Sequence, residues 1–376
     1  MRSVVTGADG IRAPLVAAWR ALADGAAEPN SFAEPWFVLA GLNNLAAGEG
    51  VRLLQIWDEG GPAPLLVGIL PLCVAPKYGR APIRHVENWR HANDFLGAPL
   101  IRAGQAQRFW VETLAVLDRA DWAAGFLHID GLVEGGEVHE GLAAAAAALA
   151  RPCPVVHRSE RALLASQLSP DAYYADTVRK KKRKELGRLA RRLADLGEVT
   201  SQTLVDEAQL TIWCEAFLAL EQSGWKGRAG SALACSRETE AFFRDALAGA
   251  LAADRLEFRR MDLDDKPIAM LINFVAPPGS FSFKTAFDED YARFSPGVLI
   301  QLDNLSVMTR SDIAWMDSCA AQNHPMIDSL WGERRSIVRV SVPLSGMQSR
   351  LAFEAARALE EGSARLRRAL RERGNG

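Results

Sequence analysis

Hydrophobic positions repeat with a helical period in two early segments, and strand-like runs follow them. Apolar side chains recur every three or four residues in Ile11–Leu22 and Phe32–Leu45, which predicts two helices. Val51–Trp57 and Leu65–Val74 are short apolar runs separated by a polar stretch, which predicts two strands and a turn. The same patterns predict two further helices and a short strand, at Gln105–Asp118, Glu137–Ala150 and Phe126–Ile129. Helices and strands therefore alternate, and we expect an α/β fold.

This hairpin pattern occurs again in the second half of the chain. Leu256–Met261 and Pro267–Val275 are strand-like runs around a polar turn, and each copy of the second strand ends in Val-Ala-Pro. A matched hairpin with a matched exit predicts two copies of one α/β unit. Chance similarity of two hairpins is the alternative.

A strand followed by a helix is predicted between residues 280 and 305. Aromatic residues alternate from Phe281 to Phe287, which indicates a half-buried strand, and an acidic turn follows. Ser295 then suits the N-cap of a helix and Pro296 its first position, while Gly297 lets a ligand approach the backbone. A helix start of this kind can bind an anion through its N–H groups and dipole. A capped helix without a ligand is the other interpretation.

One predicted helix is strongly basic. Residues 179–192 hold nine Lys or Arg side chains and one acid, Glu185. Four leucines form an apolar stripe that ends before Gly197, a suitable C-terminal cap: Leu186, Leu189, Leu193 and Leu196. The basic face fits a solvated surface, a nucleic acid, or an anionic lipid surface or donor phosphates. A second basic amphipathic helix is predicted at 348–373.

The overall composition is that of an ordinary globular protein. Hydrophobic residues make up 49% and charged residues 24%, and the net charge of −2 makes a nucleic-acid partner an unfavoured prediction. Five scattered cysteines without a C-x-x-C motif indicate a reducing compartment, and we expect no metal site. The longest apolar run is too short to span a bilayer, and we expect a cytoplasmic protein, peripheral on the inner membrane at most.

The segment Phe-Asp-Glu-x-Tyr-x-x-x-Ser-Pro-Gly-Val-Leu resembles the donor loop of the GNAT-fold acyltransferases. The branch concerned is the CelD-like one, which is related to the Fem peptidyltransferases. The basic helix and a Gly-Trp-Lys-Gly loop are also similar to that branch, over about Ser169 to Arg339. The resemblance implies tandem GNAT-like lobes at 1–165 and 166–345, each a mixed, mostly antiparallel sheet flanked by helices, with a basic helix at 346–376.

The resemblance also implies a thioester donor, acyl-CoA or an acyl carrier protein, whose pyrophosphate lies at the Ser-Pro-Gly helix start. We expect the donor to contact five residues there: Arg293, Ser295, Pro296, Gly297 and Val298. The first half contains the similar segment Asn93-Asp94-Phe95-Leu96-Gly97 but no Ser-Pro-Gly. We therefore expect the donor site only in the second half. Asn93 and Asp94 lie near a predicted strand end, where we expect them to contact the acceptor, unless they only form a turn.

In GNAT folds the strand after the donor helix carries polar groups that face the thioester. Here that strand leads into Asp317, Cys319 and His324. An imidazole titrates near neutrality, so His324 is our candidate base and Asp317 its orienting partner. Cys319 would serve a covalent route, although related enzymes mostly transfer directly. His324 also fits a loop histidine bound by backbone, and this segment departs from the usual CelD-like pattern.

We expect the substrates, through the acyl chain, a phosphate or carboxylate, or a lipid head group, to contact side chains that lie around this centre. The candidates share a cationic or aromatic character and flank the predicted donor loop: Trp225, Lys226, Lys284, Trp331, Arg334 and Arg335. Trp225 equally suits a core position, and the last three suit a surface ion-pair cluster. The expected reaction is amide formation from an acyl-thioester and an amine, preferably a long-chain lipid amine such as a sphingoid base. Fem-like aminoacyl transfer from tRNA to a cell-wall precursor and a non-enzymatic nucleic-acid binder are the alternatives.

Overall fold

The computed structural model describes residues 1–374 of the 376-residue chain, and residues 375–376 of the expected C-terminal helix lie outside the described part. The chain forms two compact units. The first contains 1–35, 48–159 and 336–376, and the second contains 36–47 and 160–335. The predicted division into the segments 1–165, 166–345 and 346–376 stays a prediction.

The first unit contains a mixed sheet with one parallel pair. Its strands follow the order β1–β2–β3–β4–β6–β13, where only β4 and β6 run parallel among the described pairs. A short strand, β5, pairs with β3. The strands are β1 Arg2–Gly7, β2 Arg52–Asp58, β3 Leu65–Ala75, β4 His85–Asn88, β5 Leu100–Ile101, β6 Phe126–Val133 and β13 Glu333–Pro343.

The second unit repeats this order of pairings. Its strands follow β8–β9–β10–β11–β12–β7, with β11 and β12 as the parallel pair. The strands are β7 Val155–Leu164, which belongs to this unit from Glu160 onward, β8 Val199–Thr203, β9 Leu256–Leu263, β10 Lys266–Ala276, β11 Gly279–Phe287 and β12 Trp315–Asp317. The expected hairpins are β2–β3 and β9–β10, at corresponding places in the two sheets. The prediction of a mixed, mostly antiparallel sheet in each half is confirmed.

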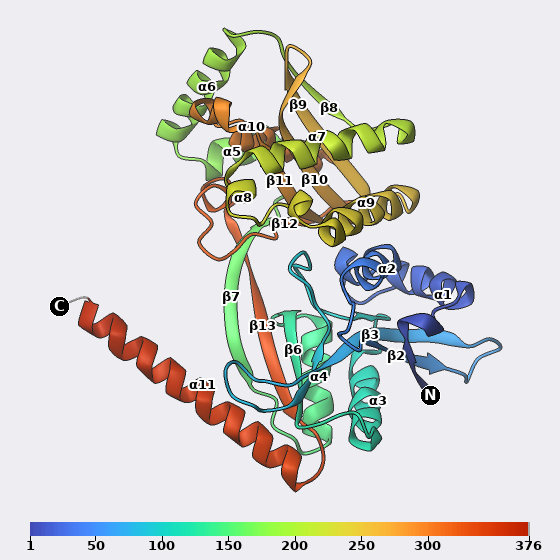
Figure 1. Cartoon of the computed structure of the whole chain (residues 1–376). Coiled ribbons are helices and arrows are strands. Elements are labelled where there is room, and N and C mark those ends of the chain that lie inside the picture. The colour runs from blue at the N-terminus through green and yellow to red at the C-terminus, as the bar shows by residue number, and fades with distance from the viewer. Residues whose placement is uncertain (375–376) are drawn as a thin grey trace. The chain divides into compact units, whose positions relative to one another are not determined.

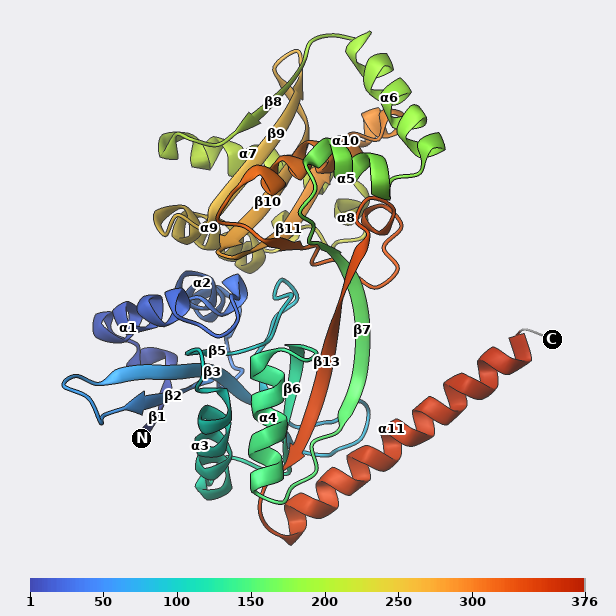
Figure 2. The ribbon, with the colours of Figure 1, turned by 180° about the vertical axis from the view of Figure 1, so that it is seen from behind.

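Helices flank both sheets (Figure 1, Figure 2). The first unit contains α1 Ala13–Asp24, α3 Ala106–Arg119, α4 Glu137–Ala148 and α11 Met347–Gly374. The second contains α2 Pro35–Asn44 except for its first residue, α5 Pro170–Thr177, α6 Lys180–Ala194, α7 Leu210–Ser223, α8 Trp225–Arg228, α9 Arg237–Ala252 and α10 Pro296–Asp303. Both views show α7 and α9 on one face of the second sheet and α5 and α10 on the other.

The basic helix α6 docks by its leucines, as predicted, but it ends earlier. Leu186 and Leu193 are buried, whereas Leu196 is 48% exposed because the helix ends at Ala194 and Asp195 is its cap. The expectations that Leu196 belongs to the docked stripe and that Gly197 caps the helix are therefore wrong. Leu193 packs with Phe294 and Leu299 beside the start of α10. Helix α6 therefore lies next to the strand–helix unit of interest.

None of the helices described within 1–374 combines the length and the apolar character that crossing a bilayer requires.

Candidate functional site

The strands β11 and β12 form the centre of the candidate site because they pair over a short distance and then part. Their parallel pairing joins Gly279–Phe281 to Trp315–Asp317 among the described residues. β11 continues to Phe287, so its later residues have β10 on one side and no paired β12 residue on the other. An unpaired strand edge presents N–H and C=O groups that an extended, amide-containing ligand can bind.

Helix α10 follows this open edge after a short 3₁₀ helix, Glu289–Phe294. Ser295 is its N-cap and Pro296 its first residue, as predicted, but Ser295 adopts φ 57° and its side chain makes no capping hydrogen bond. The N–H groups of Val298 and Leu299 both donate to the Ser295 carbonyl, at 2.9 and 3.1 Å. Because proline has no N–H, Gly297 carries the remaining donor of the first turn in the described chain. Fewer N–H groups thus converge here than we expected.

The Gly-Trp-Lys-Gly segment is a short helix, α8, rather than the expected open loop. The Trp225 N–H donates to the Glu289 carboxylate at 2.6 Å, and the indole is 58% exposed, so a core position for Trp225 is wrong. Lys226 pairs with the buried carboxylate of Glu221, its Nζ lying 2.7 Å from Oε1. These contacts tie α8 to the end of α7 and to the turn before α10.

Lys284 projects from the open part of β11 into this charged group. Burial, together with the smaller effect of the Lys226 charge, lowers the pKa of its amine to about 8, and Glu221 opposes both effects. The Nζ atom also lies 5.3 Å from the Phe283 ring centroid. An amine with such a pKa exists in both protonation states near neutral pH, which suits proton transfer as well as binding. The structure therefore brings Lys226 and Lys284 together.

Asp317 ends β12 and is completely buried. Arg161 contacts both of its oxygens, at 2.7 and 2.8 Å, and Arg335 contacts Oδ2 at 3.0 Å. Burial alone would raise the pKa of Asp317, but the two guanidiniums outweigh it and lower the pKa. The Arg335 guanidinium also lies 3.8 Å from the Trp315 ring centroid. Asp317 and Arg335 are thus parts of one buried ion-pair cluster.

The two other predicted catalytic residues follow Asp317. The Cys319 N–H donates to Asp317 at 2.9 Å, and the residue is buried with φ 54°. His324 is partly buried, and its Nδ1 lies 3.5 Å from the backbone nitrogen of Ile327. No hydrogen bond joins the side chains of His324 and Asp317 in the described structure. No described contact therefore supports the predicted role of Asp317 in orienting His324. The catalytic roles of all three stay predictions.

Trp331 and Arg334 lie on the next segment of chain. Trp331 is 1% exposed and packs with Leu186 of α6 in one hydrophobic cluster. Arg334 donates to the carbonyls of Trp331, Glu333 and Asp328, at 2.8, 2.8 and 3.3 Å. Both residues line a cavity of about 710 Å³ at the start of α6. They therefore form a second group, separate in its contacts from Lys226 and Lys284.

Asn93 and Asp94 belong to the first unit. The Leu96 N–H donates to Asp94 at 3.0 Å, which is the hydrogen bond of a turn, and Arg90 pairs with the same carboxylate at 3.5 Å. Burial raises the pKa of Asp94, and the charge of Arg90 opposes this. Asn93 is buried, and its N–H donates to His91. These contacts favour the turn interpretation, and an acceptor contact stays a prediction.

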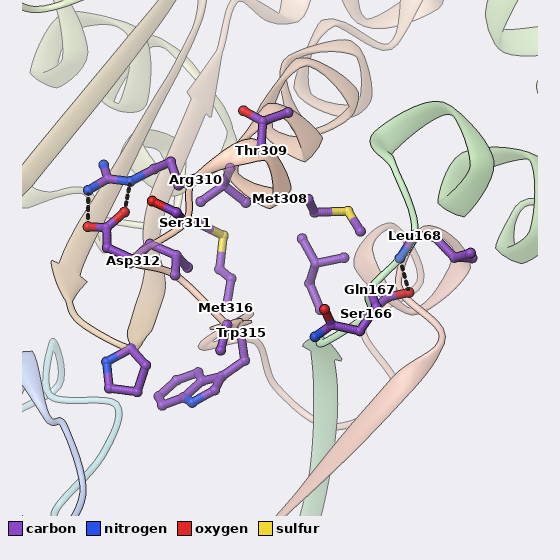
Figure 3. Close-up of a pocket in the computed structure, with 15 residues that line it drawn as sticks. Ser166, Gln167, Leu168, Met308, Thr309, Arg310, Ser311, Asp312, Trp315 and Met316 are labelled. Carbon is purple, nitrogen blue, oxygen red and sulfur yellow. Dashed lines mark hydrogen bonds and ion pairs between the residues drawn. The ribbon is translucent and has the colours of Figure 1, made fainter.

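Another cavity of the second unit contains none of the predicted site residues. It has a volume of about 360 Å³ and lies at the beginning of β12, away from the start of α10. Figure 3 shows Arg310 and Asp312 paired at its edge, with Gln167 and Met308 on the other side.

Two residues of the site were missed from the sequence. Glu221 lies under Lys226 and accepts the Leu233 N–H at 2.8 Å, and Arg161 holds Asp317. Glu221 is an acid within a helical apolar pattern, which is a readable sign of a buried carboxylate. Arg161 lies in a polar segment, and only its distant partner explains its burial.

Comparisons with known proteins agree with this geometry. Residues 180–332 match the family model of the GNAT acetyltransferase domain. The FemX crystal structure aligns over 91% of this chain and 97% of its own, with 10% identity and a TM-score of 0.57. The C-terminal domain of an Agrobacterium fabrum protein named as a lysylphosphatidylglycerol synthetase aligns over 92% and 97%, with 12% identity and a TM-score of 0.53.

A tandem GNAT protein from the clavulanic acid biosynthesis pathway aligns over 92% of this chain and 99% of its own, with 16% identity and a TM-score of 0.45. No curated protein sequence matches the chain. At such low identity the solved structures show the fold, whereas the family model identifies the segment that contains β11, α10 and β12. Residues 180–332 thus form a GNAT acetyltransferase domain, the chain has the two-lobed GNAT fold, and the protein is an N-acyltransferase.

Proposed function

We propose that the protein forms an amide by transferring an acyl group from an acyl-thioester, acyl-CoA or an acyl carrier protein, to an amine. The observation that carries this proposal is the parting of β11 and β12 before α10. The open edge of β11 suits the amide groups of the thioester arm. The start of α10, with the Gly297 N–H, the helix dipole and the exposed Arg293 beside it, suits the donor pyrophosphate.

The reaction requires that the attacking amine lose a proton and that the oxyanion be stabilised before the thiolate leaves. We propose His324 as the base, with direct transfer rather than an acyl-enzyme on Cys319. Lys284 is a second candidate for the proton step, because its pKa of about 8 leaves part of the amine unprotonated near neutrality. Trp225, exposed beside Lys226, is our candidate for covering the acyl chain.

We propose a long-chain lipid amine as the acceptor, with a sphingoid base as the most specific form of this hypothesis. The exposed basic face of α6 supports work at an anionic membrane surface. The similar fold of a protein named for lysylphosphatidylglycerol agrees with a lipid substrate. The second candidate is Fem-like aminoacyl transfer from tRNA, which the similar fold of FemX favours.

A thiol-release assay tests the reaction and the acceptor together. Acyl-CoA is offered with a sphingoid base, with a short soluble amine, and with neither. In parallel reactions aminoacyl-tRNA and a cell-wall precursor replace acyl-CoA and the amine, and transfer is followed by loss of the aminoacyl group from tRNA, because this ester releases no thiol. Amine-dependent release of thiol from acyl-CoA is the expected result. Transfer from aminoacyl-tRNA alone would replace the proposal by the Fem-like reaction, and no transfer from either donor would contradict both.

Substitution of Gly297 tests the donor site. A side chain at this position meets the Phe287 ring at 3.0 Å, so Gly297→Ala controls for the added Cβ and Gly297→Asp adds the charge. A carboxylate at the anion site should weaken acyl-CoA binding by about tenfold or more relative to the alanine variant. Equal donor affinities of the two folded variants would contradict a pyrophosphate site at the start of α10.

A further inference from the structure

The cavity at the start of α6 has the size of a small-ligand site. Its volume of about 710 Å³ lies within the range of roughly 300–1,000 Å³ that is usual for ligand pockets. Two segments of the second unit form it, the first turns of α6 with the residues before them and the chain from Pro325 to Arg334. Its charged side chains are Arg179, Lys181, Lys182, Glu185, Asp328 and Arg334.

Three of the four cations that line this cavity lack a carboxylate partner in the described structure. Among the described residues, no carboxylate lies within ion-pair distance of Arg179, Lys181 or Lys182. The Lys182 amine donates to the hydroxyl of Ser329, which orients it without neutralising it. Arg334 is held by backbone carbonyls, and its nearest acid, Asp328, lies 4.0 Å away. The cavity therefore keeps a net positive charge on positioned groups.

The start of α6 is a second source of unfavourable positive charge at the cavity. Arg179 is the N-cap and makes no side-chain capping bond, and the first turn contains lysines and no acid. Cations at a helix N-terminus are unfavourable because the dipole is positive there. In addition, the Nε1–H of Trp331, a residue that lines the cavity, has no acceptor in the described structure. An anion in the cavity would relieve the charge mismatch, and its oxygens would add hydrogen-bond acceptors.

The cavity lies apart from the donor site along α6. Leu186 packs with Trp331 near the cavity, whereas Leu193 packs with Phe294 and Leu299 beside the start of α10. From Lys182 to Leu193 the helix rises by roughly 16 Å, at 1.5 Å per residue. A single pyrophosphate cannot bridge that distance, so an anion in this cavity belongs to a different group from the one at α10.

We propose that this cavity binds a phosphoryl group carried by the amine acceptor, which makes the acceptor a phosphorylated amine. The inference rests on the proposed function, since it names the acceptor class of that reaction. Lys182 and Arg334 would contact the phosphoryl oxygens from fixed positions, while Lys181 and Arg179 would contribute charge from the rim. The acceptor's amine would then extend from the cavity toward His324, which is adjacent in the chain to Pro325 of the lining.

Calorimetric titration of the purified full chain tests the site without requiring turnover. The probe is O-phosphoethanolamine, with ethanolamine and inorganic pyrophosphate for comparison. We expect the two phosphates to bind and ethanolamine not to bind. Lys182→Gln should weaken phosphate binding by about tenfold, because a charge-assisted contact is lost. Lys184→Gln is the matched control: Lys184 is exposed on the same helix, does not line the cavity, and should leave binding unchanged.

Three results would overturn the proposal. The first is absence of phosphate binding. The second is equal weakening by Lys182→Gln and Lys184→Gln, which would indicate diffuse attraction to the basic face. The third is loss of phosphoethanolamine binding in Gly297→Asp with retention in Lys182→Gln, which would locate the probe at α10. Acyl-CoA binding that fails while the phosphate titrations succeed would count against the proposed donor site and leave this one standing.

Discussion

Because the amine of Lys284 is buried, we predict that it makes the free energy of unfolding depend on pH. Burial is the main reason why its pKa falls from 10.5 to about 8, with repulsion by Lys226 as a second cause. Below pH 8 the amine is protonated in both the folded and the unfolded chain, and the folded state bears the full cost of a buried charge. The difference between the two pKa values corresponds to about 3 kcal/mol of unfolding free energy.

The sign follows from the protons bound by each state. Between pH 8 and pH 10.5 the unfolded chain holds a proton that the folded chain has released, so the contribution of this group to stability rises with pH. Replacing Lys284 by methionine, an unbranched apolar side chain, removes the titrating group. We compare the free energy of unfolding of Lys284→Met with that of wild type at each pH. The variant minus wild-type difference should be larger at pH 7 than near pH 10.5, by up to about 3 kcal/mol.

Urea unfolding of both proteins at pH 7, 8, 9 and 10 measures this difference. Lys184→Met, a substitution of an exposed lysine, is the control and should show a difference that does not depend on pH. Packing differences between methionine and a neutral lysine change the free energy of unfolding by the same amount at every pH. Only the pH-dependent part of the difference therefore tests the prediction. A difference in free energy of unfolding between wild type and Lys284→Met that stays constant from pH 7 to pH 10 would refute the idea that the protonated Lys284 destabilises the folded state.

Two further predictions concern the end of β12. Asp317→Asn should destabilise the fold by about 3–5 kcal/mol in urea unfolding, because the buried Arg161 and the partly buried Arg335 lose their counter-charge. The half-exposed Asp312→Asn should cost no more than about 1 kcal/mol, and equal losses would contradict the buried pair. His324→Ala should lower the transfer rate about 10²–10⁴-fold and flatten its rise with pH, whereas Cys319→Ser should change it little. An inactive Cys319→Ser variant, with an acyl mass on wild-type Cys319, would establish covalent transfer instead.

The elements that the sequence predicted are apolar either along most of their length or on one regular face. The strands β3 and β10 are buried over long uninterrupted runs, and helices such as α1 and α3 bury one face, so both kinds of pattern could be recognised. The edge strands β1 and β8 were missed because neither contains a fully buried residue, which leaves no alternation. β7 was missed because it contains Arg161, whose burial depends on Asp317, far away in the sequence.

The candidate site was predictable in position but only partly in chemistry. The Ser-Pro-Gly motif located the start of α10, since proline and glycine limit the backbone locally. The φ of 57° at Ser295 and the hydrogen bonds that occupy two of the first N–H groups depend on how the preceding turn packs. The low pKa of Lys284 likewise depends on its burial beside Lys226, which no local pattern encodes.

The position of helix α2 determines how the second unit can be expressed separately from the first. Its residues from Trp36 onward belong to the second unit, although the chain on either side of Trp36–Ala47 belongs to the first. Trp36 packs on Phe274 of β10 and Phe37 on Phe242 of α9, with ring centroids 4.8 and 5.3 Å apart. A gene fragment that starts near residue 160 would encode the acetyltransferase segment without this cover. The exposed aromatic patch would make such a fragment prone to aggregate, so a separately expressed lobe has to include α2 as a grafted or added peptide.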